Sequence, residues 1–229
     1  MPRANYMTES ETEMSALTYD QLKLKHRAVR DAQPLSLSIR IHRALSWLRR
    51  AEMESEDSDA QFIFLWIALN AAYATEFGDE TAQLEQFRNF INKVLAHDTD
   101  NRIHDSLFEK FHGPIRNIFE NKYLFQPFWN GLRAHDSREA WKSSFATGTA
   151  HAMKELLDRR TTDVICRLCS RLYVLRNQLI HGGATYNGDL NRDALNDANR
   201  ILETLIPIVI DLMIALNSED FGELAYPPN

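Results

Sequence analysis

One segment of the chain constrains its fold more than any other. Residues 62–74 read Phe-Ile-Phe-Leu-Trp-Ile-Ala-Leu-Asn-Ala-Ala-Tyr-Ala, so a helix over this segment is apolar on all sides rather than along one stripe. Such a helix is buried at the centre of a bundle. The segment contains Asn70, and the other long apolar stretch, 201–216, contains Glu203, Pro207 and Asp211. Neither is typical of a membrane span, which needs about 20 apolar residues.

Amphipathic patterns predict further helices along most of the chain, at 18–31, 36–54, 80–96, 150–160, 162–181 and 191–216. Between 97 and 149 we expect only short helical turns, at 106–111, 115–121 and 138–145, because glycines and prolines such as Gly148 interrupt the pattern. The whole chain has only 8 Gly and 7 Pro in 229 residues, which argues against a β-sandwich or barrel. We therefore predict an all-α fold, a helical bundle with a central buried helix and short helical insertions.

Local sequence patterns indicate three segments along the chain. Residues 1–33 are expected to be a partly disordered leader with a short helix, 34–217 the helical domain, and 218–229 a C-terminal tail. Ser58 is a candidate N-cap for the apolar helix, and Gly78 is a candidate stop. Gly182-Gly183 is expected to end the helix over 162–181 abruptly.

Composition excludes several functional classes. A formal charge of −6 excludes a globally basic nucleic-acid binder, although a local basic patch remains possible. Two cysteines, Cys166 and Cys169, are too few for a disulfide framework and are expected in the core. The histidines His97, His104 and His112 match no standard metal spacing, so we expect no metal or cofactor. Without a recognisable signal peptide, the expected compartment is the cytoplasm.

Three residues near the end of the predicted helix 162–181 are candidates for chemistry. Arg176 lies within about 60° of Leu172 and Leu179, beside the apolar seam, where its charge needs a carboxylate, a phosphate or water. His181 falls on the last turn, where the helix dipole favours imidazolium, and its chemistry suits proton transfer near neutral pH. Asn177 shares the face of His181, but Arg176 is offset from His181 by about 140°. The two side chains could meet on one substrate if Arg176 curls around the helix, or if two copies of the helix pair and their sites merge. A salt-bridged Arg and a capping His are the alternative interpretation.

The run Arg176-Asn177-x-x-x-His181, followed by Gly182, resembles the Arg-x4-6-His signature of HEPN (higher eukaryote and prokaryote nucleotide-binding) domains. Residues 49–73 and 173–216 are similar to the first and last core helix pairs of bacterial stand-alone HEPN proteins. The resemblance covers about residues 36 to 216. It implies a homodimer with facing motifs and metal-independent cleavage of RNA by attack of the ribose 2′-hydroxyl, in a toxin or an antiviral-defence effector. By position, Arg176 and His181 take the catalytic roles and Asn177 a positioning role. A separately encoded antitoxin or regulator is a possible partner.

Charge near this motif agrees with a site that faces RNA. Residues 154–181 carry six Lys or Arg against three Asp or Glu, a local excess of +3. Arg167 lies within about 40° of His181 in helical phase, and Arg171 within about 80°, so both are candidate phosphate contacts. Asn70 needs a partner if it is buried, and it either supports the site or ties two helices together. The sequence also leaves open a HEPN-fold module that binds RNA, nucleotide or a partner without cutting, and a plain helical scaffold.

Overall fold

The computed structural model describes residues 17–74, 80–136, 138–216 and 221–227, with only the backbone of 80–83. These residues form ten α-helices, one π-helix and one 3-10 helix, and no strand occurs among them. The all-α class is therefore confirmed. The elements are α1 (Tyr19–Val29), α2 (Leu35–Glu52), α3 (Ser58–Tyr73), α4 (Glu80–Ala96), α5 (Arg102–Asp105), the π-helix Ser106–Lys110, α6 (His112–Glu120), the 3-10 helix Lys122–Leu124, α7 (Gln126–Arg133), α8 (Ala140–Leu157), α9 (Thr161–Ile180) and α10 (Arg192–Ala215).

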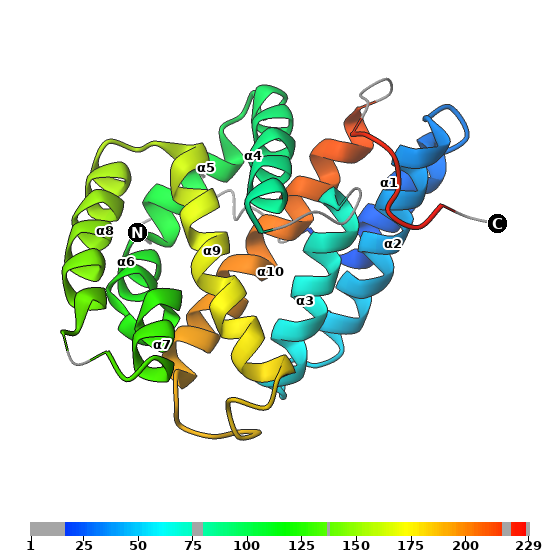
Figure 1. The fold of residues 1–229 in the computed structure, drawn as a ribbon. Coiled ribbons are helices and arrows are strands. Elements are labelled where there is room, and N and C mark those ends of the chain that lie inside the picture. The colour runs from blue at the N-terminus through cyan, green and yellow to red at the C-terminus, as the bar shows by residue number, and fades with distance from the viewer. Residues whose placement is uncertain (1–16, 75–79, 137, 217–220, 228–229) are drawn as a thin grey trace, which may run out of the picture.

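The apolar helix α3 packs between α2 on one side and α9 and α10 on the other, and it also contacts α4 (Figure 1). Six of its apolar side chains are buried, including Phe62, Leu65 and Leu69. One face is covered less completely, since Phe64, Ile67, Asn70 and Ala71 are only half-buried. A helix predicted to be buried on all sides therefore keeps one partly open face, and this face borders a cavity described below.

Several predicted boundaries differ from the structure: α7 was not predicted, and α8 spans both the turn predicted at 138–145 and most of the helix predicted at 150–160. The N-cap of α3 is Asp57, whose Oδ1 accepts a hydrogen bond from the Ala60 amide at 3.0 Å, so the prediction of Ser58 as the cap is wrong. The predicted break at Gly148 is also absent, because α8 runs through this residue. One glycine costs a helix only about 1 kcal/mol, and packing of α8 on α6, α7 and α9 outweighs that cost. Gly78 lies outside the described residues.

Both flanking segments of the chain join the bundle. Helix α1 packs on α2 and α10 and buries Leu22 and His26. At the other end, Phe221 is buried and lies 5.5 Å from the ring of Phe90, measured between centroids. The described parts of the predicted leader and tail thus pack against the predicted helical domain; residues 1–16 lie outside the described part.

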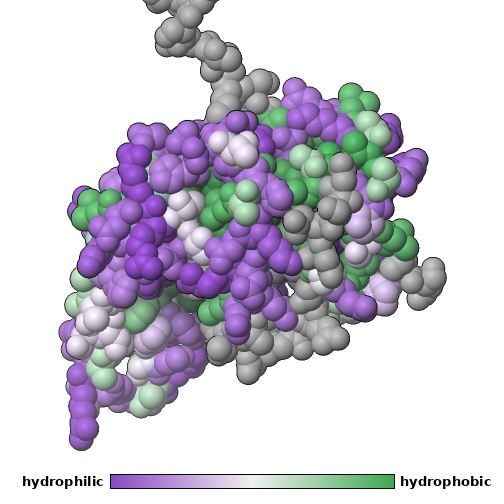
Figure 2. Space-filling model, turned by 90° about the horizontal axis from the view of Figure 1, so that it is seen from above, coloured by the Kyte–Doolittle hydropathy of each residue, from purple (hydrophilic) through white to green (hydrophobic). Residues whose placement is uncertain are grey.

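The surface is mostly polar. Seen from above, hydrophilic side chains cover most of the described surface, with small separate hydrophobic patches between them (Figure 2). Among the described residues, no helix combines the length and apolar character that crossing a membrane requires.

Candidate functional site

The end of α9 positions the predicted motif. Gly182 adopts a left-handed conformation with φ of 67°, and the amides of Gly183 and Ala184 both donate to the carbonyl of Gln178, at 2.7 and 3.0 Å. This closes the helix as the glycine pair predicted. His181 is the last residue before the turn, and its amide donates to the carbonyl of Asn177 at 3.1 Å. Its side chain is exposed.

Arg176 is half-buried, and its charge is not neutralised by a carboxylate of the described residues. Its Nη1 donates to Asn177 Oδ1 at 2.9 Å, and its guanidinium carbon lies 5.9 Å from the centroid of the Tyr173 ring. The salt-bridged arginine of the alternative interpretation is therefore not found. Asn177 holds Arg176 rather than His181, and within one copy the side chains of Arg176 and His181 make no contact in the described part of the chain.

Arg176 borders a cavity of about 630 Å³ that is lined by residues of α2, α3, α4, α9 and the C-terminal segment. Asn70 lines the same cavity from α3, so the structure brings together two residues that the sequence selected 106 positions apart. The Asn70 side-chain amide has no hydrogen-bond partner among the described residues. It therefore does not tie two helices together, and it is free to meet a ligand.

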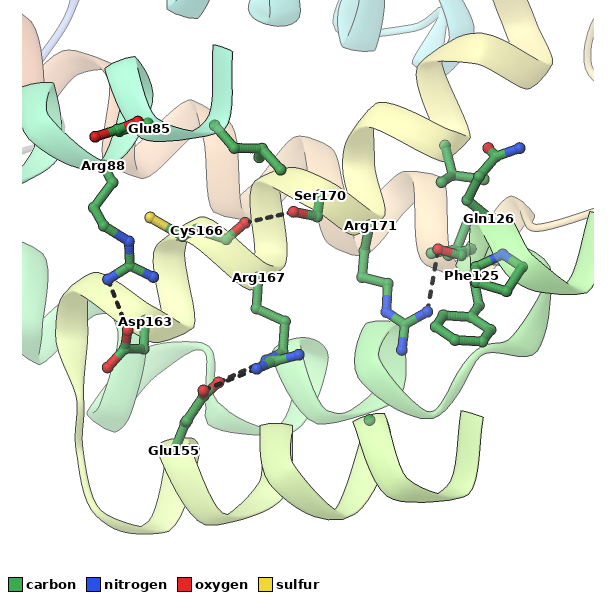
Figure 3. Close-up of a pocket in the computed structure, with 15 residues that line it drawn as sticks. Glu85, Arg88, Phe125, Gln126, Glu155, Asp163, Cys166, Arg167, Ser170 and Arg171 are labelled. Carbon is green, nitrogen blue, oxygen red and sulfur yellow. Dashed lines mark hydrogen bonds and ion pairs between the residues drawn. The ribbon is translucent and has the colours of Figure 1, made fainter. Parts of the chain in front are cut away.

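The charge on this cavity is one-sided. Arg43 and Arg176 are among its described lining residues, which include no Asp or Glu, in a protein whose acidic residues outnumber Lys and Arg by 32 to 26. A cavity with this lining attracts anions. A second cavity, of about 490 Å³ between α4, α8 and α9, has three arginines and three carboxylates in its lining, and two of the arginines, Arg88 and Arg167, pair with Asp163 and Glu155 (Figure 3). Its charges cancel, which leaves the cavity at Arg176 as the candidate anion site.

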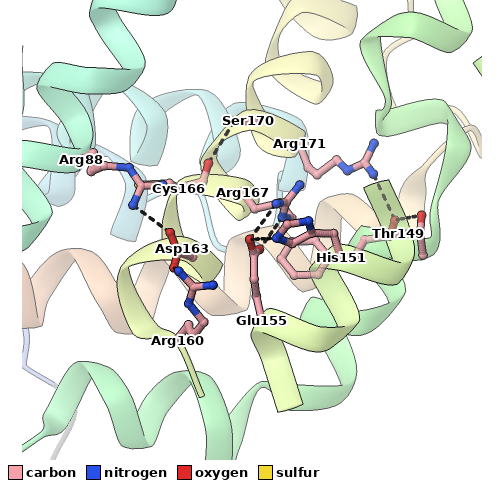
Figure 4. A network of polar contacts seen from close by, with 11 residues as sticks. Arg88, Thr149, His151, Glu155, Arg160, Asp163, Cys166, Arg167, Ser170 and Arg171 are labelled. Carbon is pink, nitrogen blue, oxygen red and sulfur yellow. Dashed lines mark hydrogen bonds and ion pairs between the residues drawn. The ribbon is translucent and has the colours of Figure 1, made fainter. Parts of the chain in front are cut away.

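Arg167 and Arg171 both line the second cavity and are engaged within the protein. Arg167 forms a bidentate ion pair with Glu155, at 2.6 and 2.8 Å, and His151 contacts the same carboxylate at 3.3 Å (Figure 4). Hydrogen bonding to Glu155 raises the pKa of Arg167.

The side chain of Arg171 is buried, at 5% exposure. It donates to the carbonyls of Leu124 and Phe119, both at 3.3 Å, and its guanidinium carbon lies 4.7 Å from the centroid of the Phe125 ring. Burial lowers its pKa to about 10, so the side chain remains charged at neutral pH. Arg167 and Arg171 thus use their guanidinium groups for contacts within the protein, and their role as phosphate contacts stays a prediction.

The C-terminal segment forms part of the cavity wall, which sequence patterns did not reveal. Arg40 is 1% exposed and donates to the carbonyls of Phe221, Gly222 and Glu223 at 2.7 to 3.4 Å. Arg43 donates to the carbonyl of Tyr226 at 2.8 Å. Arg40 lies three and four positions from the buried Leu37 and Ala44, and this spacing places it on the inner face of α2.

The cysteines and histidines take structural positions. Cys166 and Cys169 are free and buried, and burial raises the pKa of both thiols. The His104 Nδ1 lies 2.9 Å from Thr161 Oγ1, between α5 and α9. In the described ranges, no three His, Cys, Asp or Glu side chains are grouped as ligands of a metal ion would be.

The loop after His181 is fixed to the start of α3. The Tyr186 hydroxyl donates to Asp57 at 3.1 Å, the Asn187 amide donates to Asp59 at 3.0 Å, and Arg192 forms an ion pair with Asp59 at 3.0 Å. These contacts hold the turn that carries His181 against the central helix.

No protein-family model, no curated protein and no solved structure matches this chain. The assignment of a function to this chain therefore depends on its own residues.

Proposed function

We propose that the protein is a metal-independent endoribonuclease of the HEPN type that acts on RNA through Arg176, Asn177 and His181. The observation that carries the proposal is the state of Arg176: it is half-buried, held by a neutral amide, and borders a cavity whose described lining has no carboxylate. A guanidinium in such a place is suited to an anionic substrate, and a phosphodiester is the anion that the motif implies.

The proposed reaction is transfer of the phosphodiester to the neighbouring ribose oxygen. His181 accepts the proton of the 2′-hydroxyl, the 2′-oxygen forms a bond to phosphorus, and the bond from phosphorus to the 5′-oxygen breaks. The 5′-oxygen takes up a proton, which leaves a cyclic phosphate and a 5′-hydroxyl end. Arg176 stabilises the charge that develops on the phosphoryl oxygens, and Asn177 holds Arg176 in position.

A homodimer remains part of the proposal, paired through the end of α9. The apolar seam of α9, formed by Ile165, Leu168, Leu172 and Leu175, is buried in the core of one copy, so it is not available to a second. Apolar side chains exposed near His181 are Ile180, Tyr186 and Leu190. A pairing through this end of α9 would bring His181 of one copy toward Arg176 of the other. Light scattering at micromolar concentration should give twice the monomer mass of 26.5 kDa.

The proposed setting, a toxin or antiviral-defence effector in the cytoplasm, comes from the resemblance of the motif and its flanking helices. A separately encoded antitoxin or regulator belongs to the same proposal.

Cleavage of RNA by purified protein tests the function. We expect Arg176→Ala and His181→Ala each to lower the rate by about 10²-fold or more, because each removes transition-state charge stabilisation or proton transfer. Cleavage should persist in a chelator. The matched controls are Arg27→Ala and His112→Ala, both exposed residues far from the motif in the sequence. Folded Arg176 and His181 variants that cut at the wild-type rate would refute the assignment.

One observation favours the alternative of a binding module without catalysis. Within one copy, the side chains of Arg176 and His181 do not meet in the described part of the chain, so a monomer has no assembled pair. Tight RNA binding without cleavage by wild-type protein, whether monomer or dimer, would select this alternative.

A further inference from the structure

The cavity beside Arg176 has an aromatic wall built from three helices. Trp47 of α2, Trp66 of α3 and Tyr173 of α9 line it. The rings of Trp66 and Tyr173 lie 6.3 Å apart between centroids, and Trp47 stacks on Phe64 at 5.8 Å with 19° between the ring planes. Trp47 is still 37% exposed. A large ring kept partly in water at the edge of a cavity offers a surface on which another flat ring can stack.

The polar groups of the same cavity suit the rest of a nucleotide. The amide of Asn70, which has no side-chain partner in the described residues, offers two donors and one acceptor, the pattern that reads the edge of a nucleobase. Arg43 and Arg176 supply positive charge, and no described carboxylate of the lining opposes it. Aromatic faces, one free amide and unopposed guanidinium groups thus lie around one space.

The size and the boundary of the cavity limit what can enter. A volume of about 630 Å³ falls within the range of sites for small ligands. Leu224, Ala225 and Tyr226 of the C-terminal segment line one side, where the carbonyl of Tyr226 accepts from Arg43. A base inside a duplex is stacked on both faces and paired, so it cannot reach such a wall, whereas an unpaired base can.

We propose that this cavity binds one unpaired nucleotide of the RNA, with the base against the aromatic wall and its edge at Asn70, and with the phosphate toward Arg43 and Arg176. The proposal rests on the proposed function, since it takes RNA as the ligand, but it concerns binding and not cleavage. It predicts that the protein selects single-stranded RNA over duplex RNA and that base stacking contributes to the selection.

Fluorescence anisotropy of a labelled eight-nucleotide RNA tests the proposal. All measurements use the His181→Ala background, so that cleavage does not remove the probe. The same strand annealed into a duplex and an abasic strand of equal charge are the comparison ligands. We expect the single strand to bind at least tenfold more tightly than either.

Variants of the wall give the second test. Trp47→Ala and Asn70→Ala should each weaken binding of the single strand about three- to tenfold and should leave binding of the abasic strand nearly unchanged. The matched control is Arg49→Ala, because Arg49 lies on the same helix as Trp47, is exposed and does not line the cavity. Its effect should stay within about twofold. Trp47→Phe should restore most of the affinity, and Asn70→Asp, which places a negative charge in the cavity, should weaken binding most.

The outcomes separate this proposal from the proposed function. Equal affinity for the single strand, duplex and abasic strand would overturn the nucleotide pocket, as would Trp47 and Asn70 variants that behave like the control. Wild-type protein that cuts RNA while these variants bind normally would retain the ribonuclease and reject the pocket. Wild-type protein that never cuts but shows the expected binding pattern would retain the pocket and reject the catalysis.

Discussion

Replacement of Arg171 provides a test of whether a basic residue near the motif serves the fold or the RNA. Its two hydrogen bonds, to the carbonyls of Phe119 and Leu124, come from a charged donor and are long, at 3.3 Å. Bonds of this kind contribute about 1.5 kcal/mol each at the weak end of their range. Stacking on Phe125 adds about 1 kcal/mol. Removal of the guanidinium also removes the desolvation cost of a buried charge, which offsets part of this sum.

We therefore expect Arg171→Ala to lower the free energy of unfolding by about 2 to 4 kcal/mol. Urea denaturation followed by circular dichroism measures the change. Arg171→Met keeps much of the volume and the contact with Phe125, so its loss should be smaller and should report mainly the two hydrogen bonds. Arg138→Ala is the exposed control, and its effect should stay within about 0.5 kcal/mol.

RNA binding by the same variants completes the test. Arg171→Met should bind RNA as the wild type does, because the guanidinium faces carbonyls of the α6–α7 region and not solvent. If Arg171→Ala were as stable as Arg138→Ala and yet bound RNA much more weakly, the structural role would be refuted.

Two further predictions concern stability. Burial, followed by the charge of Lys23, lowers the pKa of His26 to about 4 from 6.5. Between pH 6.5 and 4, His26 therefore takes up a proton in the unfolded chain but not in the native protein. The free energy of unfolding should fall by roughly 3 kcal/mol over this range. Urea denaturation at pH 7 and 4 measures this loss, and a His26→Gln variant with an unchanged pH slope would contradict it. At the start of α3, Asp57→Ala should lower the free energy of unfolding by about 1 kcal/mol, and Ser58→Ala should lower it much less. Thermal denaturation measures both changes, and a larger loss for Ser58→Ala would identify Ser58 as the N-cap.

Periodic patterns predicted the helices well, because a helix depends on residues three and four positions apart. The helix 80–96 was predicted with the bounds that α4 has. The sequence also selected Asn70 and Arg176, since each is a polar residue in or beside an apolar pattern, and both line one cavity.

Contacts between distant segments were not predictable in this way. Arg40 meets the carbonyl of Glu223, 183 residues away, and the C-terminal segment has no periodic pattern that would indicate it. A count of charges does not show that Arg167 faces Glu155 or that Arg171 reaches backbone carbonyls of the inserted helices.

The burial of both thiols has a practical consequence for measuring how two copies meet. Cys166 and Cys169 are the only cysteines in the sequence, both are buried, and their raised pKa values keep them protonated at neutral pH. The thiolate is the form of cysteine that attacks thiol reagents, so the native residues should react slowly. A new cysteine at an exposed position, such as Ile180→Cys, therefore becomes the preferred target for a spin label or a short cross-linker without removal of any native residue. Distances between such labels would report directly on whether the ends of two α9 helices face each other.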